Sequence, residues 1–321
     1  MISAPLAQRP LGRTGLHVSE RGFGAWAIGG SSYGPVSRAD ALDALACAED
    51  HGCNFVDTAA VYGESEARLG EFLSGRRERW IVASKFSGQP EGLAAVVDSQ
   101  LTRLRTDRLD VYQLHWAPRG VEEQLYAALA RLRDTGKIRF IGVSLRSGGD
   151  LEHVLSRGLV DVVQLPVSLL DPEPLTSHAA LVRQRGVGVI ARSALRGGFL
   201  TGKYDGRARF TSAEDQRATW KAEDVRRLAE QAEAFAFLGE GAVERLAGAI
   251  GYALSFETVS TVILGCKNRE QARQNFGTPH VALSDETLKQ VTKAQRRLPL
   301  SAPSPFARAV RKLLRLIQRE P

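Results

Sequence analysis

Residues 52–66 read Gly52-Cys53-Asn54-Phe55-Val56-Asp57-Thr58-Ala59-Ala60-Val61-Tyr62-Gly63-Glu64-Ser65-Glu66, and this stretch decides how the rest of the sequence is interpreted. The segment from Asn54 to Val56 predicts a short, largely apolar strand. Asp57 stands where this strand gives way to a loop of small residues, and Tyr62 follows in the loop. The stretch therefore predicts a carboxylate and a phenol at the end of one strand.

Two later strands are expected to end in further reactive side chains. Residues 80–85 predict a strand that ends in Lys85, and residues 109–115 predict one that ends in His115. If these strands are parallel neighbours, their carboxyl ends meet at the same edge. The four polar groups would then rise from one rim.

This combination of groups suits the reduction of a carbonyl. A phenol has an ordinary pKa of about 10 and is a poor acid near neutral pH unless a nearby cation favours its anion. We expect Lys85 to be that cation and Asp57 to keep it charged and in place. Tyr62 could then protonate a carbonyl oxygen as a hydride reaches the carbon, while a neutral His115 donates a hydrogen bond to the same oxygen.

Each of these residues has a simpler interpretation when it is considered alone. A strand-end aspartate is more often a helix cap or a turn former, and a nearby tyrosine is more often a packing residue. A strand-end lysine is usually solvated, and a histidine next to Trp116 would usually be structural. Four different reactive groups at the ends of three successive strands are hard to attribute to packing.

At these residues the chain resembles the aldo-keto reductase superfamily, whose catalytic tetrad is Asp, Tyr, Lys and His in this order. The resemblance extends from about Arg9 to about Leu298, and residues 105–116 resemble the family's approach to its histidine. It implies catalytic roles for Asp57, Tyr62, Lys85 and His115. The first signature of the family is matched at Gly52, Asp57, Tyr62, Glu66 and Gly70.

The sequence predicts an α/β fold, a (β/α)8 TIM barrel formed by residues 1–298, because 321 residues suit one barrel and short apolar strands alternate with amphipathic helices. No Gly-x-Gly-x-x-Gly motif joins a strand to a helix, which argues against a Rossmann domain. Residues 11–16 predict a hairpin, which the resemblance places at the bottom of the barrel. Helices are expected at 39–52, 64–74, 91–105 and 122–136, and further strands at 138–143, 160–165, 187–191 and 260–264.

Composition sets further limits. Hydrophobic residues make up 43% and charged residues 25%, as in an ordinary soluble globular protein. The amino terminus lacks the pattern of a signal peptide, and no apolar run is long enough to span a membrane, so we expect a cytoplasmic protein without a transmembrane segment. The three cysteines have no disulfide or zinc spacing, and we expect free thiols and no metal site.

The resemblance also implies a cofactor site in the later barrel loops. Residues 189–204 resemble the loop that handles the pyrophosphate, and residues 263–275 resemble the segment that holds the adenosine end. Lys267 would meet a 2′-phosphate, which favours NADPH over NADH. Leu145, Ala194, Leu264 and Cys266 depart from the residues that the family commonly has. The cofactor-binding residues expected in this way are Ser144, Gln164, Arg192, Ser193, Leu195, Gly197, Lys203, Gly265, Lys267, Gln271 and Asn275.

The substrate is less well defined by the sequence. Trp26, Tyr33 and Trp116 are expected on the catalytic rim, where aromatic walls suit apolar or aromatic aldehydes. Arg119 and Arg146 could suit a carboxylate or a phosphate on the substrate. The charged residues 205–221 predict a lid or an entrance loop. We expect a small-molecule carbonyl substrate and no nucleic-acid partner.

Residues 299–321 are expected to form a proline-rich link and a basic amphipathic helix, with apolar side chains on one face of 306–319. This helix could dock on the barrel, on a second subunit, or on an anionic surface or acidic partner.

Three functions remain open at this stage. The first is an NADPH-dependent carbonyl reductase that uses Tyr62 as the proton donor. The second is a regulatory barrel that binds NADPH and turns over slowly. The third is a Schiff-base aldolase that uses Lys85 as the nucleophile.

Overall fold

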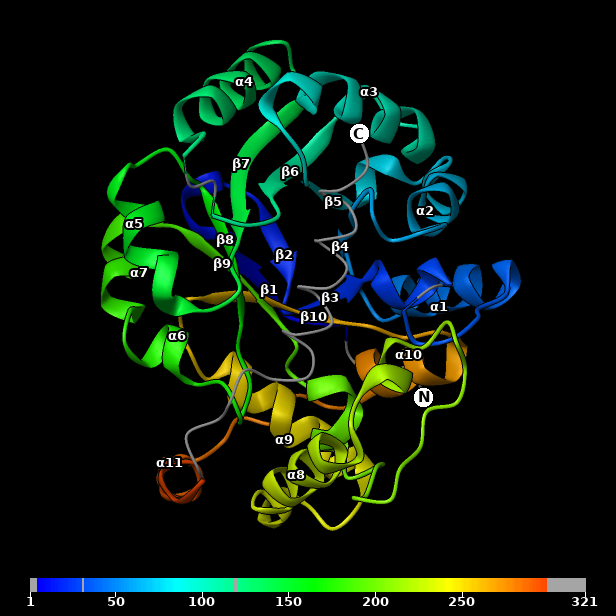
Figure 1. Cartoon of the computed structure of the whole chain (residues 1–321), viewed down its shortest axis with the longest axis vertical. Coiled ribbons are helices and arrows are strands. Elements are labelled where there is room, and N and C mark those ends of the chain that lie inside the picture. Colours follow the sequence, from blue (N-terminus) through cyan, green and yellow to red (C-terminus); the bar gives the residue numbers. More distant parts are fainter. Residues whose placement is uncertain (1–4, 31, 118–119, 299–321) are drawn as a thin grey trace.

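Eight parallel strands close into a barrel in the computed structural model, which describes residues 5–30, 32–117 and 120–298. The strands are hydrogen-bonded in the order β10-β3-β4-β5-β6-β7-β8-β9, so each strand lies beside its neighbour along the chain and β10 returns to β3. Figure 1 shows the barrel at the centre of the molecule. The bounds are β3 (Arg21–Gly24), β4 (Phe55–Asp57), β5 (Ile81–Phe86), β6 (Leu109–Leu114), β7 (Ile138–Ser144), β8 (Val162–Pro166), β9 (Gly188–Arg192) and β10 (Val259–Leu264).

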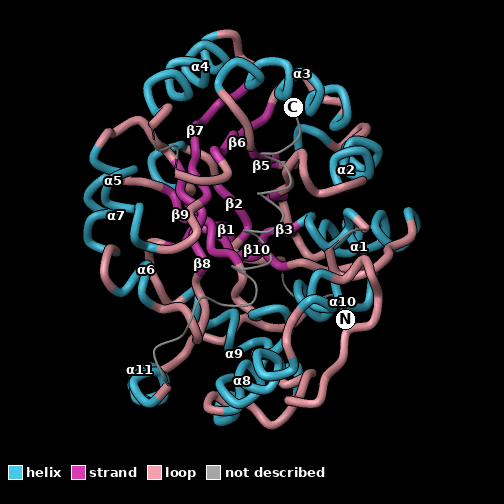
Figure 2. Tube along the Cα trace, in the orientation of Figure 1, coloured by secondary structure: helices cyan, strands magenta, loops and turns pink. Residues whose placement is uncertain are grey.

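Helices surround the barrel on its outside (Figure 2). Capping residues fix several of their ends: Ser37, Asn268 and Ser284 accept backbone N–H groups at helix starts, and Gly186 ends a helix with a φ of 62°. None of the described helices is long and apolar enough to span a membrane. They are α1 (Arg38–Asp50), α2 (Ser65–Leu73), α3 (Leu93–Leu104), α4 (Glu122–Asp134), α5 (Leu151–Ser156), α6 (Glu173–Thr176), α7 (Ala179–Arg185), α8 (Ala222–Glu233), α9 (Ala242–Leu254), α10 (Arg269–Gly277) and α11 (Asp285–Arg297).

The barrel predicted from the sequence is confirmed, and the strands and helices that were assigned begin and end within about two residues of the expected positions. Asp57 is the last residue of β4 instead of the first residue beyond it. The basic helix expected at 306–319 lies outside the described residues.

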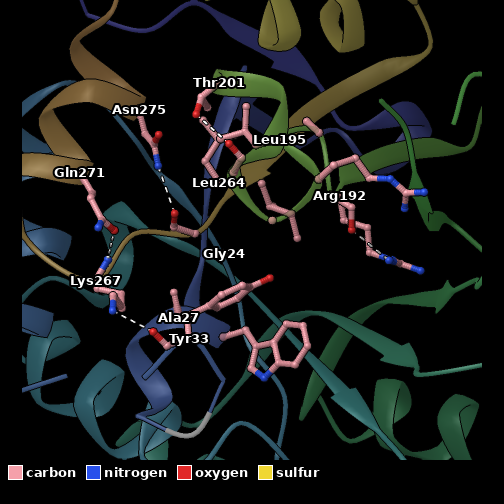
Figure 3. A pocket seen from close by; sticks show the side chains of 18 of the residues that line it. Gly24, Ala27, Tyr33, Arg192, Leu195, Thr201, Leu264, Lys267, Gln271 and Asn275 are labelled. Carbon is pink, nitrogen blue, oxygen red and sulfur yellow. Dashed lines mark hydrogen bonds between the residues drawn. The ribbon is translucent and has the colours of Figure 1, made fainter. Parts of the chain in front are cut away.

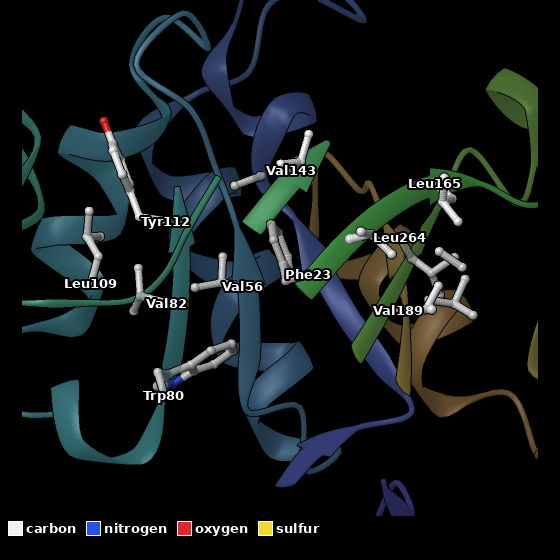
Figure 4. Close-up of a cluster of buried hydrophobic side chains, with 14 of the residues drawn as sticks. Phe23, Val56, Trp80, Val82, Leu109, Tyr112, Val143, Leu165, Val189 and Leu264 are labelled. Carbon is white, nitrogen blue, oxygen red and sulfur yellow. The ribbon is translucent and has the colours of Figure 1, made fainter. Parts of the chain in front are cut away.

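Alternation along the strands divides the barrel residues into two layers. Side chains that face outward pack against the helices, and Figure 4 shows this layer with Val56, Val82 and Tyr112 among its members. The neighbouring positions face inward, where one apolar cluster fills the interior. That cluster consists of Leu11, Val18, Phe55, Ala83, Val111, Val162 and Ile190.

The same alternation places polar residues directly above the apolar interior. Two positions beyond an interior apolar residue, the strands present Asp57 after Phe55, Lys85 after Ala83, Gln113 after Val111, Gln164 after Val162 and Arg192 after Ile190. Because all the strands of the barrel are parallel, these side chains emerge at one end. That end is the carboxyl-terminal face, where the sequence predicts the reactive rim.

An antiparallel hairpin closes the opposite end of the barrel, as the resemblance implied. β1 (Gln8–Pro10) pairs with β2 (His17–Ser19), and Leu11 and Val18 are completely buried within the interior cluster. Gly12 lies against the start of β9, and a Cβ at this position would approach the backbone nitrogen of Gly188 to 2.2 Å. The hairpin therefore needs a residue without a side chain at its closest approach to the barrel.

Gly12→Ala is predicted to destabilise the fold by about 3 kcal/mol, because the new methyl group meets backbone atoms that cannot move away and the φ of 53° is strained for alanine. Gly15→Ala is the matched control, since Gly15 has a φ of 74° but no atom within 4 Å of the added Cβ. It should lose only about 1 kcal/mol for the backbone strain. Urea unfolding of both variants measures the difference, and equal losses would contradict the close approach.

Candidate active site

A buried ion pair lies at the centre of the rim. Lys85 donates to the carboxylate of Asp57 and to the carbonyl of Thr58 at 2.9 Å, and neither charged side chain is exposed by more than 2%. The second carboxylate oxygen of Asp57 accepts hydrogen bonds from the amides of Gln113 at 2.9 Å and Gln164 at 2.8 Å. Because a buried charge is tolerated only when it is paired and hydrogen-bonded, these contacts hold both groups in one position.

The pKa of Lys85 is set by two opposing effects. Burial is the largest effect and favours the neutral amine, but Asp57 and Tyr62 together outweigh it and raise the pKa of Lys85 above its ordinary value. The proton on Lys85 therefore stabilises the folded state in full at any pH below the unfolded pKa of about 10.4. This stabilisation is lost as the pH rises through the pKa of the folded state. Lys85 is charged at neutral pH, as the sequence predicts.

Tyr62 lies next to this pair, but its pKa differs from our expectation. The Lys85 ammonium is 4.9 Å from the centre of the Tyr62 ring. Burial raises the pKa of Tyr62 more than Lys85 lowers it, so the net pKa is above the ordinary value. The expected effect of Lys85 is present, yet it does not produce a phenol with a lowered pKa. The hydroxyl is fully protonated at neutral pH.

His115 completes the group from the end of β6. Its ring centre is 6.0 Å from that of Tyr62, and it stacks on Trp116 with 4.2 Å between ring centres. Burial and the charges of Lys85, Arg192 and Arg146 hold the pKa of His115 well below its usual range, so the imidazole is neutral. The predicted Asp57, Tyr62, Lys85 and His115 are therefore brought together.

Ser87 is a contact of His115 that the sequence analysis missed. Its hydroxyl is 3.0 Å from Nδ1 of His115, so this contact does not use Nε2. Gln113, which binds Asp57, was also missed. The alternation of side chains along a strand could have identified both residues, because Ser87 is two residues beyond Lys85 and Gln113 is two residues before His115.

A second buried network fixes β5 from outside the barrel. Glu66 of α2 accepts hydrogen bonds from Ser84 at 2.9 Å and from Gln100 at 2.8 Å. Gln100 also donates to the carbonyl of Lys85 at 3.2 Å, and Tyr112 donates to Gln100 at 2.6 Å. This network connects α2 and α3 to the backbone that carries Lys85. It therefore helps to fix the position of the Lys85 ammonium relative to Asp57.

One elongated cavity of about 560 Å³ opens above these groups. Figure 3 shows Lys267, Gln271 and Asn275 on one side of it and Arg192 on the other. Asp57, Tyr62 and His115 line the cavity, as do Trp26, Tyr33, Trp116 and every residue that we expected at the cofactor. Lys85 lies beneath its floor and is not part of the lining. Arg119 lies outside the described residues.

The loop expected to act as a lid crosses to the opposite side of the pocket. Gln216 donates its backbone N–H to the carbonyl of Ser32 at 2.9 Å, and Gly34 donates to Glu214 at 3.3 Å. Arg217 anchors the loop by pairing with Asp215 at 2.7 Å and lies 4.1 Å from the centre of the Phe210 ring. Arg217 was missed because an arginine in a charged loop is usually solvated.

Comparison with known proteins agrees with this geometry. The sequence model of the Aldo/keto reductase family matches residues 22–296. The chain belongs to the aldo/keto reductase family.

Relatives within the family differ in the activities that their names describe. L-galactose dehydrogenase of Arabidopsis thaliana is 30% identical over 307 residues, which cover 88% of this chain and 92% of that protein. NADH-specific methylglyoxal reductase of Escherichia coli is 28% identical and covers 86% and 94% of the two chains. The holo form of aldo-keto reductase AKR11C1 from Bacillus halodurans superimposes with a TM-score of 0.75 at 24% identity, over 90% of this chain and 96% of that one.

The pocket of this aldo/keto reductase suits an anionic nicotinamide cofactor, the class that the family uses. Lys203 and Lys267 supply positive charge along the cavity. The loop that contains Ser193 and Arg196 has a strained backbone. These two residues have φ values of 61° and 47°, which residues other than glycine rarely adopt. Such strain concentrates where a backbone is shaped around a ligand. The described residues contain no group of three metal-ligating side chains.

Asp57→Asn is predicted to destabilise the protein by about 3–5 kcal/mol, because the buried Lys85 ammonium loses its counter-charge. The double variant Asp57→Asn/Lys85→Met should lose less than the two single variants combined. As a control for ion pairs in general, Glu71→Gln removes the partner of Arg38, whose side chain is 69% exposed, and should change stability by less than about 1 kcal/mol. A double-mutant cycle in urea measures these terms, and additive losses would contradict the coupling.

Proposed function

We propose that this aldo/keto reductase reduces an aldehyde or a ketone to the alcohol, with NADPH as the hydride donor and Tyr62 as the proton donor. The observation that carries the proposal is the position of Tyr62. Its ring lies 4.9 Å from the buried Lys85 ammonium and faces His115 across the same pocket. A carbonyl oxygen placed between the phenol and the imidazole meets two hydrogen-bond donors.

The protonation states suit reduction. The raised pKa of Tyr62 keeps its hydroxyl protonated at neutral pH, so the group can act as a general acid. As the proton leaves, the adjacent Lys85 ammonium stabilises the phenolate that forms. Asp57 keeps that ammonium charged and fixed. His115 is neutral and donates one hydrogen bond, which orients the carbonyl without competing for the proton.

The cofactor would occupy the long axis of the pocket. Ser144 and Gln164 line the cavity and would meet the carboxamide, and the loop from Ser193 to Gly197 would meet the pyrophosphate. Bound in this way, the reduced nicotinamide supplies the hydride to the carbonyl carbon. The carbonyl thus gains a hydride at carbon and a proton at oxygen, and the products are the alcohol and the oxidised cofactor.

Lys267 supports a preference for NADPH over NADH. Its ammonium donates to the carbonyl of Tyr33 at 2.8 Å, and it retains N–H groups for a further acceptor. A 2′-phosphate on this side of the pocket would meet that charge. Gln271 accepts the backbone N–H of Lys267 at 3.0 Å and holds the segment in place.

No observation favours an aldolase. A Schiff base requires a neutral amine that reaches the substrate, whereas Lys85 is charged, completely buried and not part of the pocket lining. The carboxyl-terminal tail, a possible docking device for a regulatory barrel, lies outside the described residues.

Tyr62→Phe tests the proposed function directly. It should lower kcat for aldehyde reduction by about 10²–10⁴-fold, because only the proton donor is removed. The affinity for NADPH, measured by quenching of protein fluorescence, should change by less than about twofold, well below the loss of one hydrogen bond. Turnover of a panel of aromatic and aliphatic aldehydes is followed by NADPH absorbance. Undiminished turnover in Tyr62→Phe would refute the role of Tyr62, and absence of turnover in the unmodified protein would refute the activity.

Ser87→Ala tests how His115 is oriented. In the proposed reaction Nε2 of His115 carries the proton, so the Ser87 hydroxyl must donate to Nδ1. Loss of this hydrogen bond should reduce kcat by about 2- to 10-fold, and Ser87→Thr should restore most of it. Long-range ¹⁵N spectra of the histidine rings, assigned with His115→Gln, should show a neutral Nε2–H tautomer in the unmodified protein at pH 6.5, and an Nδ1–H tautomer would contradict the assignment.

A further inference from the structure

Two arginines lie beside the reacting centre, on the side of the pocket away from Lys267. Arg192 follows the interior face of β9 and lines the cavity, opposite Lys267, Gln271 and Asn275 in Figure 3. Arg146 follows β7 and is exposed, with its guanidinium 4.6 Å from the centre of the Trp116 ring. Trp116 in turn stacks on His115. Arg192 therefore lies in the cavity wall, and Arg146 lies behind Trp116, outside the lining of the cavity.

Arg192 has donors that the protein does not use. It donates to the carbonyl of Leu145 at 2.9 Å and to the hydroxyl of Ser193 at 3.3 Å. Both acceptors are neutral, and no carboxylate of the described residues forms an ion pair with Arg192. A guanidinium has five N–H groups, so three are not used in these two hydrogen bonds. A half-buried cation with neutral partners is suited to an anion from outside the protein.

Several other charged groups near the pocket have partners within the protein. Arg196 pairs with Asp171 at 3.0 Å, Arg217 pairs with Asp215, and Asp57 is occupied by Lys85. Asp57 is the only carboxylate among the described residues that line the cavity, and it lies at the floor. A substrate that enters therefore meets the positive charge of Arg192 near His115, and the one acidic side chain among the described lining residues, Asp57, is neutralised by Lys85.

We propose that this pocket selects carbonyl compounds that carry a carboxylate or another oxyanion, and that Arg192 and Arg146 bind that group while Tyr62 and His115 bind the carbonyl. The proposal rests on the proposed reductase function and adds a substrate class to it. Arg192 presents a planar fork that matches two oxygens of a carboxylate, and Arg146 can approach the same group from the Trp116 side.

The experiment compares 4-formylbenzoate with 4-formylbenzamide, two aldehydes of nearly the same shape that differ in charge. The unmodified protein should favour the carboxylate by about tenfold or more in kcat/KM, since hydrogen bonds to a charged group contribute more than those to an amide. Arg146→Gln and Arg192→Gln should each lower this ratio several-fold. Both substrates use the same cofactor, so the ratio cancels any change in cofactor binding. Glyceraldehyde 3-phosphate and glyceraldehyde form a second pair that separates phosphate from carboxylate selection.

Arg131→Gln is the matched control, because Arg131 is an exposed cation on α4, remote from the β7 and β9 strand ends, and its loss should leave the ratio within about twofold. Arg146→Lys keeps the charge and should retain part of the preference. If the amide is reduced as well as the carboxylate, in a reaction that requires Tyr62, the selectivity is refuted and the reductase function stands. A preference that survives both arginine variants would also refute it. If neither aldehyde nor any other carbonyl is reduced, both proposals fail.

Discussion

The ion pair between Asp57 and Lys85 is the constraint on which the rest of the site depends. Two opposite charges are buried at the top of an apolar barrel interior, where neither is tolerated without the other. Four strands contribute the residues of the ion pair and its hydrogen bonds: β4 provides Asp57, β5 provides Lys85, β6 provides Gln113 and β8 provides Gln164. The site is therefore complete only when these strands are in register, because the Asp57 carboxylate takes one amide partner from β6 and the other from β8.

Much of this arrangement could be predicted from the sequence, because it follows from two simple rules. Strand ends in a parallel barrel meet at one face, which located Asp57, Lys85 and His115. Alternation along a strand would also have located Gln113 and Ser87, had it been applied beyond the strand-end residues. The position of Arg217 could not have been predicted from the sequence, because it depends on a long loop that crosses the pocket to residues 32–34.

The pKa of Tyr62 illustrates a different limit. The sequence identifies the neighbouring cation and therefore the direction of its effect. It does not give the degree of burial, which here has the larger effect and reverses the net direction. Leu145 is a similar case. Its side chain departs from the family pattern, yet its backbone carbonyl accepts a hydrogen bond from Arg192, a contact that the side chain alone did not reveal.

The position of Lys85 beneath the pocket floor has a chemical consequence for the proposed reduction of aldehydes. Free amines condense with aldehydes, and a lysine within reach of the substrate would be modified by the compound that the enzyme is meant to convert. Here the nearest amine is protonated, enclosed by Asp57 and Thr58, and separated from the cavity by the residues above it. The cations that do face the reacting centre are arginines, whose guanidinium groups stay protonated and do not form Schiff bases. In the proposed reaction, Lys85 therefore acts through Tyr62 and is itself shielded from the aldehyde.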